Sequence, residues 1–186
     1  MEVQSQEIPG VFCVTSTRHA DARGSFARLF CEAAFAGAGV SDFRPVQSSL
    51  STNVEPYTLR GMHYQAPPYA ETKLVQVVQG AVYDVALDLR PDSATFGRSL
   101  GFRLSADEAS GVFIPKGCAH GFLTLTPDTL LVYYMDASHK AEAARGVRWN
   151  DPAFSIDWPV DPVVISSRDA EYPDVELDEI YRHYGA

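Results

Sequence analysis

The chain has 186 residues, of which 46% are apolar and 21% are charged. This composition excludes intrinsic disorder and a coiled coil, and the length fits one domain, residues 1–186, with a sizeable core. Fifteen basic and 24 acidic side chains give a net charge of −9. Such a field does not attract nucleic acid or an anionic membrane, so binding an anionic small molecule requires a local set of arginines and lysines.

The N-terminal residues lack the basic start and apolar run of a signal peptide, and no apolar stretch approaches the ~20 residues that span a bilayer. We therefore expect a cytoplasmic protein. The three cysteines, Cys13, Cys31 and Cys118, are far apart, which excludes a disulfide framework and a zinc knuckle. Cys13 and Cys118 lie in apolar or glycine-rich surroundings and are expected to be small core residues.

The predicted elements are mostly strands. A short Ala-rich helix is expected at 31–38, followed by two apolar, β-branched strands at 74–78 and 81–89, which are joined only by Gln79 and Gly80. Further strands are expected at 100–104, 111–114, 121–125 and 130–135, and a C-terminal helix at 177–184. Strands at spacings of about 8–12 residues, with no helices between them, predict an all-β sandwich or barrel.

Two segments concentrate polar chemistry. Residues 58–65, followed by Glu71 and Lys73, place Arg60, His63 and Lys73 in or just before β-structure, where burial is costly without a purpose. Residues 115–122 place His120 on an apolar strand beside Gly121, which would let another backbone approach closely. Singly, each residue also fits a structural role: a satisfied histidine, or an edge-strand lysine that opposes aggregation.

Strand parity makes a specific prediction about this region. Lys73, Val75 and Val77 share a face, so Lys73 can point inward among apolar neighbours. Arg60 and His63 have opposite parity and can face one cavity only if their strand is irregular. Gly61, between them, is the natural place for a bulge, so we predict an irregularity there.

Six motifs, in one order along nearly the whole chain, carry a family resemblance. They are residues 21–26 (DARGSF), 59–65 (LRGMHYQ), 73–85 (KLV, then Gly80 and YDV), 89–97 (LRPDSATFG), 114–122 (IPKGCAHGF) and 146–152 (GVRWNDP). Together they resemble the dTDP-4-dehydrorhamnose 3,5-epimerase family. The resemblance implies a cupin-type double-stranded β-helix (jelly roll), here with short peripheral helices. It also implies a homodimer, no metal or redox cofactor, and a nucleotide-linked 4-keto-6-deoxy sugar, dTDP-linked in the family, as substrate.

The chemistry that the resemblance implies needs three groups. A carbonyl at C4 acidifies the protons at C3 and C5, so a base can leave an enolate that an acid on the opposite face reprotonates with inversion. Fixed positive charge must stabilise the oxyanion. His63 matches the family's base, Asp169 the carboxylate that orients it, and Tyr133, rather than Tyr134, the acid. Lys73 is the candidate for the positive charge.

The substrate-binding residues that the resemblance implies are Arg23, Phe26, Gln47, Arg60, His120, His139 and Arg168, with Arg23 matching a pyrophosphate contact. The chain departs from the family pattern at several positions on the nucleotide-binding side. Arg28 stands where a Glu is usual, residues 48–50 (SSL) replace an acid, an amide and a His, and residues 137–139 (ASH) replace a Tyr-Tyr pair. His139 is the candidate to take over the missing aromatic contact.

Two alternatives remain at this point. His63, Glu71 and His120 resemble the mixed nitrogen and oxygen ligands of a metal-dependent cupin enzyme. Against a metal, the close His-x-His pair is absent and Lys73 would add a positive charge. The other alternative is a cupin that binds a nucleotide sugar without catalysis, although binding alone does not require His63, Asp169 and Tyr133 together.

Overall fold

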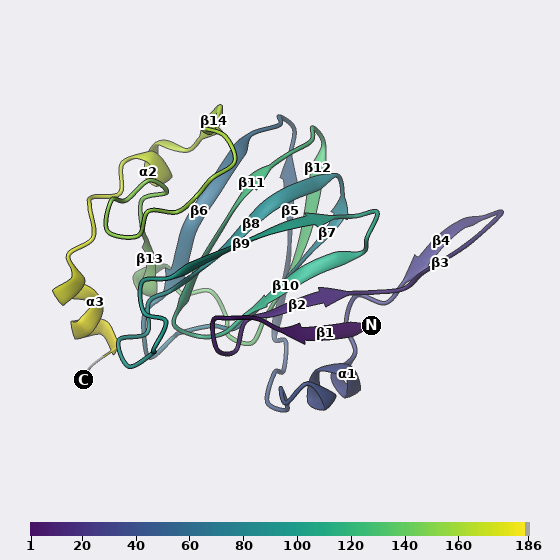
Figure 1. Cartoon of the computed structure of the whole chain (residues 1–186), viewed down its shortest axis with the longest axis horizontal. Helices are drawn as coiled ribbons and strands as arrows, with labels where there is room; N and C mark the ends of the chain where they lie inside the picture. Colours follow the sequence, from purple (N-terminus) through teal and green to yellow (C-terminus); the bar gives the residue numbers. More distant parts are fainter. Residues whose placement is uncertain (185–186) are drawn as a thin grey trace.

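Two antiparallel sheets face each other across the core of a computed structural model, which describes residues 1–184 (Figure 1). The first sheet has the order β1 (Glu2–Ser5), β2 (Phe12–Thr15), β10 (Ser110–Ile114), β7 (Lys73–Gln79), β12 (Thr129–Met135) and β5 (Gln47–Asn53). The second has the order β13 (Ala144–Gly146), β6 (Thr58–Gln65), β11 (Cys118–Thr124), β8 (Ala81–Asp88) and β9 (Ser99–Ser105), and β14 (Val164–Ile165) pairs with β6.

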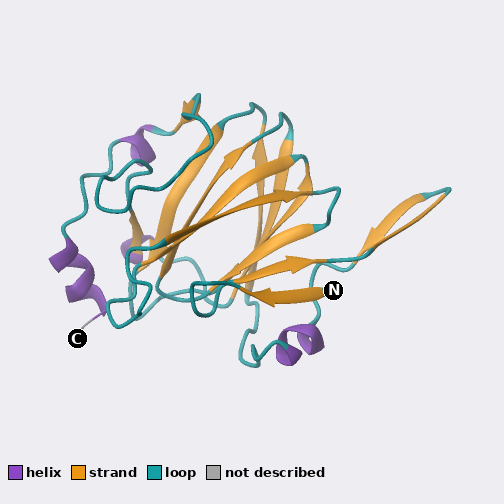
Figure 2. Cartoon of the chain, viewed as in Figure 1, coloured by secondary structure: helices purple, strands orange, loops and turns teal. Residues whose placement is uncertain are grey.

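The remaining elements lie around this sandwich (Figure 2). A separate hairpin of β3 (Arg18–Asp21) and β4 (Gly24–Ala27) projects away from the body of the protein. The helical segments are short: α1 (Glu32–Gly37), the 3-10 turn Ala141–Ala143, α2 (Ser167–Ala170) and α3 (Leu177–Tyr184). None of the helices within residues 1–184 is long and apolar enough to cross a membrane.

The predicted all-β fold with short peripheral helices is confirmed, and the arrangement fits a jelly roll. Each predicted strand is present, displaced by no more than a few residues at its ends, and both predicted helices form. The amino-terminal strands, the hairpin, β5 and the short strands β13 and β14 were not predicted. The sequence of β5, QSSLSTN, has only one apolar residue, so it lacks the apolar alternation by which a strand is detected.

Apolar packing occupies both the space between the sheets and their outer faces. Val75 and Val77 of β7 pack between the sheets with Leu131 of the neighbouring strand β12 and Phe122 of β11 in the facing sheet, as strand parity predicted. Cys118 belongs to the same cluster, and burial raises the pKa of its thiol to about 12. The other two clusters cover the outer faces.

An irregularity in β6 confirms the prediction for Gly61. His63 pairs with His120 of β11 and Arg60 pairs with Phe122, so an advance of three residues along β6 matches an advance of two along β11. Gly61 has a φ of +137°, in the region that favours glycine. The extra residue reverses the parity of the strand, and both Arg60 and His63 consequently face the same cavity.

We predict that Gly61→Ala destabilises the protein by about 2 kcal/mol or more, because the new side chain meets backbone at an unfavourable φ. A Cβ at Gly61 would lie 2.4 Å from the Cα of Gly121. Gly37, at the end of α1, is a matched control, since a Cβ there meets nothing within 4 Å. Urea denaturation of both variants checks this, and equal stabilities for the two would show that β6 has no such close contact.

Candidate active site

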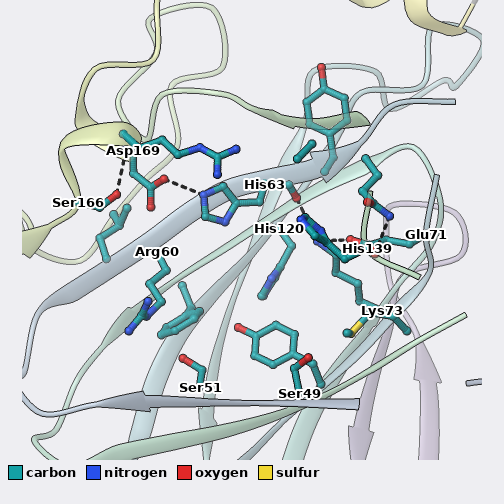
Figure 3. A pocket seen from close by; sticks show the side chains of 18 of the residues that line it. Ser49, Ser51, Arg60, His63, Glu71, Lys73, His120, His139, Ser166 and Asp169 are labelled. Atoms are coloured by element: carbon teal, nitrogen blue, oxygen red, sulfur yellow. Dashed lines mark hydrogen bonds and ion pairs between the residues drawn. The ribbon is translucent and has the colours of Figure 1, made fainter. Parts of the chain in front are cut away.

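A cavity of about 820 Å³ lies between the two sheets, large enough for a bound small molecule (Figure 3). Its walls come from both sheets and from the segment that carries α2. Nine of the eleven predicted site residues line it: Gln47, Arg60, His63, Lys73, His120, Tyr133, His139, Arg168 and Asp169.

His63 and Asp169 form the closest acid–base pair of this cavity. The Nε2 atom of His63 lies 2.7 Å from Oδ1 of Asp169. The imidazole is 40% exposed, whereas the carboxylate is 6% exposed. An ionised carboxylate can only accept a hydrogen bond, so Nε2 of His63 carries the hydrogen atom. The lone pair of the neutral ring is then on Nδ1, the nitrogen left free for a ligand.

Asp169 is fixed by backbone as well as by His63. It lies in α2, whose cap residue Ser166 accepts the Asp169 N–H at 3.1 Å, and its Oδ2 accepts the Gly61 N–H at 3.2 Å. Burial disfavours the charged carboxylate, but the hydrogen bond and charge of His63, the Gly61 N–H and Arg168 outweigh it and lower the pKa of Asp169. The bulge in β6 therefore anchors the partner of its own histidine.

Lys73 is buried in the cavity wall and held by fixed acceptors. Its Nζ lies 3.1 Å from Glu71 Oε1 and donates to the His63 carbonyl at 3.3 Å. Glu71 Oε2 in turn accepts from Gln65 Nε2 at 3.0 Å, so the carboxylate is held from two sides. The ammonium group has three N–H donors, which leaves one for a bound oxygen atom.

His120 has its own buried carboxylate partner. Its Nε2 lies 2.9 Å from Oδ2 of Asp84, and the two side chains are 4% and 0% exposed. The ring packs edge-on against Tyr133, with centroids 5.8 Å apart. Asp84 is a site residue that the sequence analysis missed; an acid on the apolar strand 81–89 was its only signal.

Tyr133 reaches the cavity from the opposite sheet. It pairs with Ser49 and Val75 on the strands beside β12, while Tyr134 turns to the outer face and stacks on Phe30. Burial, reinforced by the charge of Asp84, raises the pKa of Tyr133 well above its usual range, although Arg60 partly opposes this. The phenol is therefore protonated at neutral pH and can donate a proton.

Two predicted residues lie outside the cavity. Arg23 and Phe26 are on the projecting hairpin, where the Arg23 side chain is 89% exposed and bonds to Asp21, and Phe26 is 74% exposed. The residues of the metal alternative, His63, Glu71 and His120, line the cavity, but within residues 1–184 no three His, Cys, Asp or Glu side chains form a group that could hold a metal ion. Glu71 is instead bonded to Lys73 and Gln65.

Comparison with known proteins places this geometry in a family. A sequence model of dTDP-4-dehydrorhamnose 3,5-epimerases matches residues 5–176. The Escherichia coli dTDP-4-dehydrorhamnose 3,5-epimerase is 39% identical over 186 aligned positions, which cover 98% of this chain and 97% of that protein. The chain belongs to the dTDP-4-dehydrorhamnose 3,5-epimerase family. It is an isomerase, as the motifs implied.

A solved structure and a further relative show the range of this epimerase family. The crystal structure of the Bacillus anthracis enzyme, with TDP and pyrophosphate bound, superposes with a TM-score of 0.88 at 38% identity and covers 94% of this chain and 99% of that one. A Streptomyces niveus relative, 33% identical over 92% of this chain and 82% of its own length, is a dTDP-4-dehydrorhamnose 3-epimerase. Family members therefore differ in the centres they invert.

We predict that the stabilising effect of Asp169 in this epimerase depends on pH. A carboxylate whose pKa is lower in the folded state stabilises that state above its unfolded pKa of about 4, and the contribution is lost as pH falls through the folded pKa. The difference in free energy of unfolding between wild type and Asp169→Asn should narrow as pH falls from about 6 to about 3.

Urea denaturation at each pH measures this difference. The exposed ion pair of Glu7 with Arg98 offers a control, because Glu7→Gln should change stability little at any of these pH values. A difference between wild type and Asp169→Asn that is constant across the pH range would contradict the prediction.

Proposed function

We propose that this epimerase removes a proton from a carbon beside the C4 carbonyl of a dTDP-linked 4-keto-6-deoxyhexose. It returns a proton to the opposite face, inverting C3, C5 or both. One observation carries the proposal: the His63–Asp169 pair and a protonated Tyr133 project from facing sheets into one cavity. A base and an acid on opposite walls are what inversion through a planar enolate requires.

In this mechanism His63 is the base. Its Nε2 is engaged by Asp169, so Nδ1 takes the proton, and the nearby carboxylate stabilises the imidazolium that forms. Asp169 acts through His63 by fixing its tautomer and orientation. Its lowered pKa keeps it ionised at neutral pH, where that role is needed.

Lys73 stabilises the charge that develops on the substrate. Deprotonation beside the carbonyl moves negative charge to the C4 oxygen, and a fixed ammonium in a water-poor cavity is an effective partner for it. Glu71 and the His63 carbonyl hold two directions of the Lys73 ammonium in place. Little reorganisation is then needed at the moment of reaction.

Tyr133 is the acid that completes inversion. We predict that Tyr133→Phe retains exchange of substrate protons with solvent deuterium but loses most of the inverted product, because the base is intact and the donor on the opposite wall is gone. His63→Ala should abolish exchange at both carbons and leave dTDP affinity nearly unchanged. NMR of the products from a panel of dTDP-4-keto-6-deoxyhexoses in heavy water measures exchange and inversion together.

Three outcomes of this experiment count against the proposal. Inversion by Tyr133→Phe at the wild-type rate would remove the acid role. Unimpaired exchange by His63→Ala would remove the base role. Wild-type protein that binds dTDP but exchanges no proton in any substrate of the panel would favour a nucleotide-sugar-binding protein without catalysis.

The exposed hairpin and an apolar strip on the sheet edge support a homodimer as the functional unit. Val46, Leu50 and Val54 recur at every fourth position, with Leu50 inside β5 and the two valines just beyond its ends. Their exposed fractions are 62%, 62% and 63%. β5 is both the edge of the first sheet and part of the cavity wall. A partner hairpin packed along this edge would bring Arg23 and Phe26 to the cavity mouth and cover the apolar strip.

Mixed dimers test this arrangement. We predict that Arg23→Ala weakens substrate binding by about 10- to 100-fold, as expected for a charged hydrogen bond, and that His63→Ala is inactive. Co-expression of the two variants should restore up to about a quarter of wild-type activity at low substrate. This fraction follows if Arg23 serves the partner's cavity, because half of the dimers are then mixed and each mixed dimer has one intact site out of two. If Arg23 serves its own subunit, no intact site forms, and activity should not rise above that of the separate variants.

A further inference from the structure

Arg60 is held in the cavity wall by uncharged partners. Its Nε donates to Asn53 Oδ1 at 2.7 Å, and its Nη2 donates to the Thr52 carbonyl at 3.2 Å. Both acceptors are neutral, and no carboxylate of the described residues forms an ion pair with Arg60. By contrast, the buried ammonium of Lys73 is paired with the carboxylate of Glu71.

The orientation of the Asn53 amide follows from its other contacts. Asn53 is the last residue of β5 and is 2% exposed. Its Nδ2 donates to the Thr129 carbonyl at 3.1 Å and lies 3.3 Å from Ser51 Oγ. A carbonyl can only accept, so the amide nitrogen must face Thr129 and the amide oxygen must face Arg60. The acceptor for Arg60 is thus rigid, buried and uncharged.

This contact leaves most of the guanidinium available. The two bonds use two of the five N–H donors of an arginine, and Arg60 is an exposed residue of β6 that lines the cavity. Figure 3 shows its side chain extended along the cavity wall near Ser51. An arginine stays charged at any relevant pH, so its full positive charge is directed at the cavity.

We propose that Asn53 is a positioning residue that fixes Arg60 without neutralising it and so reserves the charge for the diphosphate of the nucleotide sugar. This inference rests on the proposed function, with a dTDP-linked sugar as substrate, and on the substrate-binding role of Arg60 that the family resemblance implies. A carboxylate at position 53 would hold the guanidinium with similar geometry and a stronger bond. It would also cancel the attraction for an anion in a chain whose net charge is already −9.

Calorimetric titration with dTDP tests the inference. Asn53→Asp should raise the Kd for dTDP about tenfold, and the KM for the nucleotide sugar in parallel, while kcat changes less than about threefold. In an Arg60→Ala background the same substitution should change the Kd less than about twofold, because Asn53 acts through Arg60. A merely structural effect of the substitution would be equal in both backgrounds.

Asn150→Asp is the matched control. Asn150 Oδ1 accepts from Arg148 Nε at 2.9 Å in an exposed Asn–Arg contact that is not part of the cavity wall, and Arg148 also forms an ion pair with Asp174. This substitution adds the same charge to the chain and should leave the Kd for dTDP unchanged. Because a carboxylate facing the Thr129 carbonyl also lowers stability, Asn53→Ala, which adds no charge, is measured alongside and should raise the Kd only about two- to fivefold.

The outcomes distinguish failure of the inference about Asn53 from failure of the proposed function. If Arg60→Ala weakens dTDP binding but Asn53→Asp does not, or if Asn53→Ala weakens it as much as Asn53→Asp, the inference about Asn53 is wrong and the proposed function stands. If Arg60→Ala has no effect on dTDP binding, Arg60 is not a ligand of the nucleotide and the inference fails with that assignment. Absence of proton exchange in the wild type would overturn the proposed catalysis alone, since dTDP binding is measured independently.

Discussion

One extra residue in β6 is the feature on which the site depends. In a regular strand Arg60 and His63 would lie on opposite faces, and one of them would point away from the cavity. The bulge at Gly61 puts both on the inner face and also directs the Gly61 N–H at Asp169, 3.2 Å away. A single backbone feature therefore aligns two functional side chains and anchors the carboxylate that orients one of them.

The close approach of two strands and apolar packing hold this bulge in place. Because neither residue has a side chain, Gly61 and Gly121 allow β6 and β11 to approach more closely than any side chain would permit. On the outer side Met62 is fully buried in the cluster that includes Val85 and Val147. A shift of register in β6 would expose Met62 and lose these contacts, so the irregular register is the stable one.

The sequence predicted features that depend on local pattern and could not predict those that depend on register between strands. Alternation along 73–77 predicted that Lys73 points inward. The opposite parity of Arg60 and His63 predicted the position of the bulge without any information on strand pairing. The partnership of His120 with Asp84 joins residues 36 apart in sequence, and it requires the pairing of β8 with β11. Arg23 shows a different limit, because a motif identifies a residue without saying where its strand projects.

The charges inside the cavity explain how an acidic chain can handle an anionic substrate. Glu71 fixes the ammonium of Lys73 but cancels most of its attraction for a distant anion, and Asp169 and Asp84 place further negative charge beside His63 and His120. In the proposed function, attraction of the diphosphate is assigned to arginines bound to neutral groups, such as Arg60 on Asn53 and Arg168, whose Nε donates to the Tyr172 hydroxyl at 2.9 Å. The ammonium proposed to stabilise the enolate has an acidic partner that holds it in place, whereas the arginines proposed to bind the diphosphate have neutral acceptors that leave their charge uncancelled. The charge of each partner thus distinguishes the proposed catalytic cation from the proposed binding cations of one cavity.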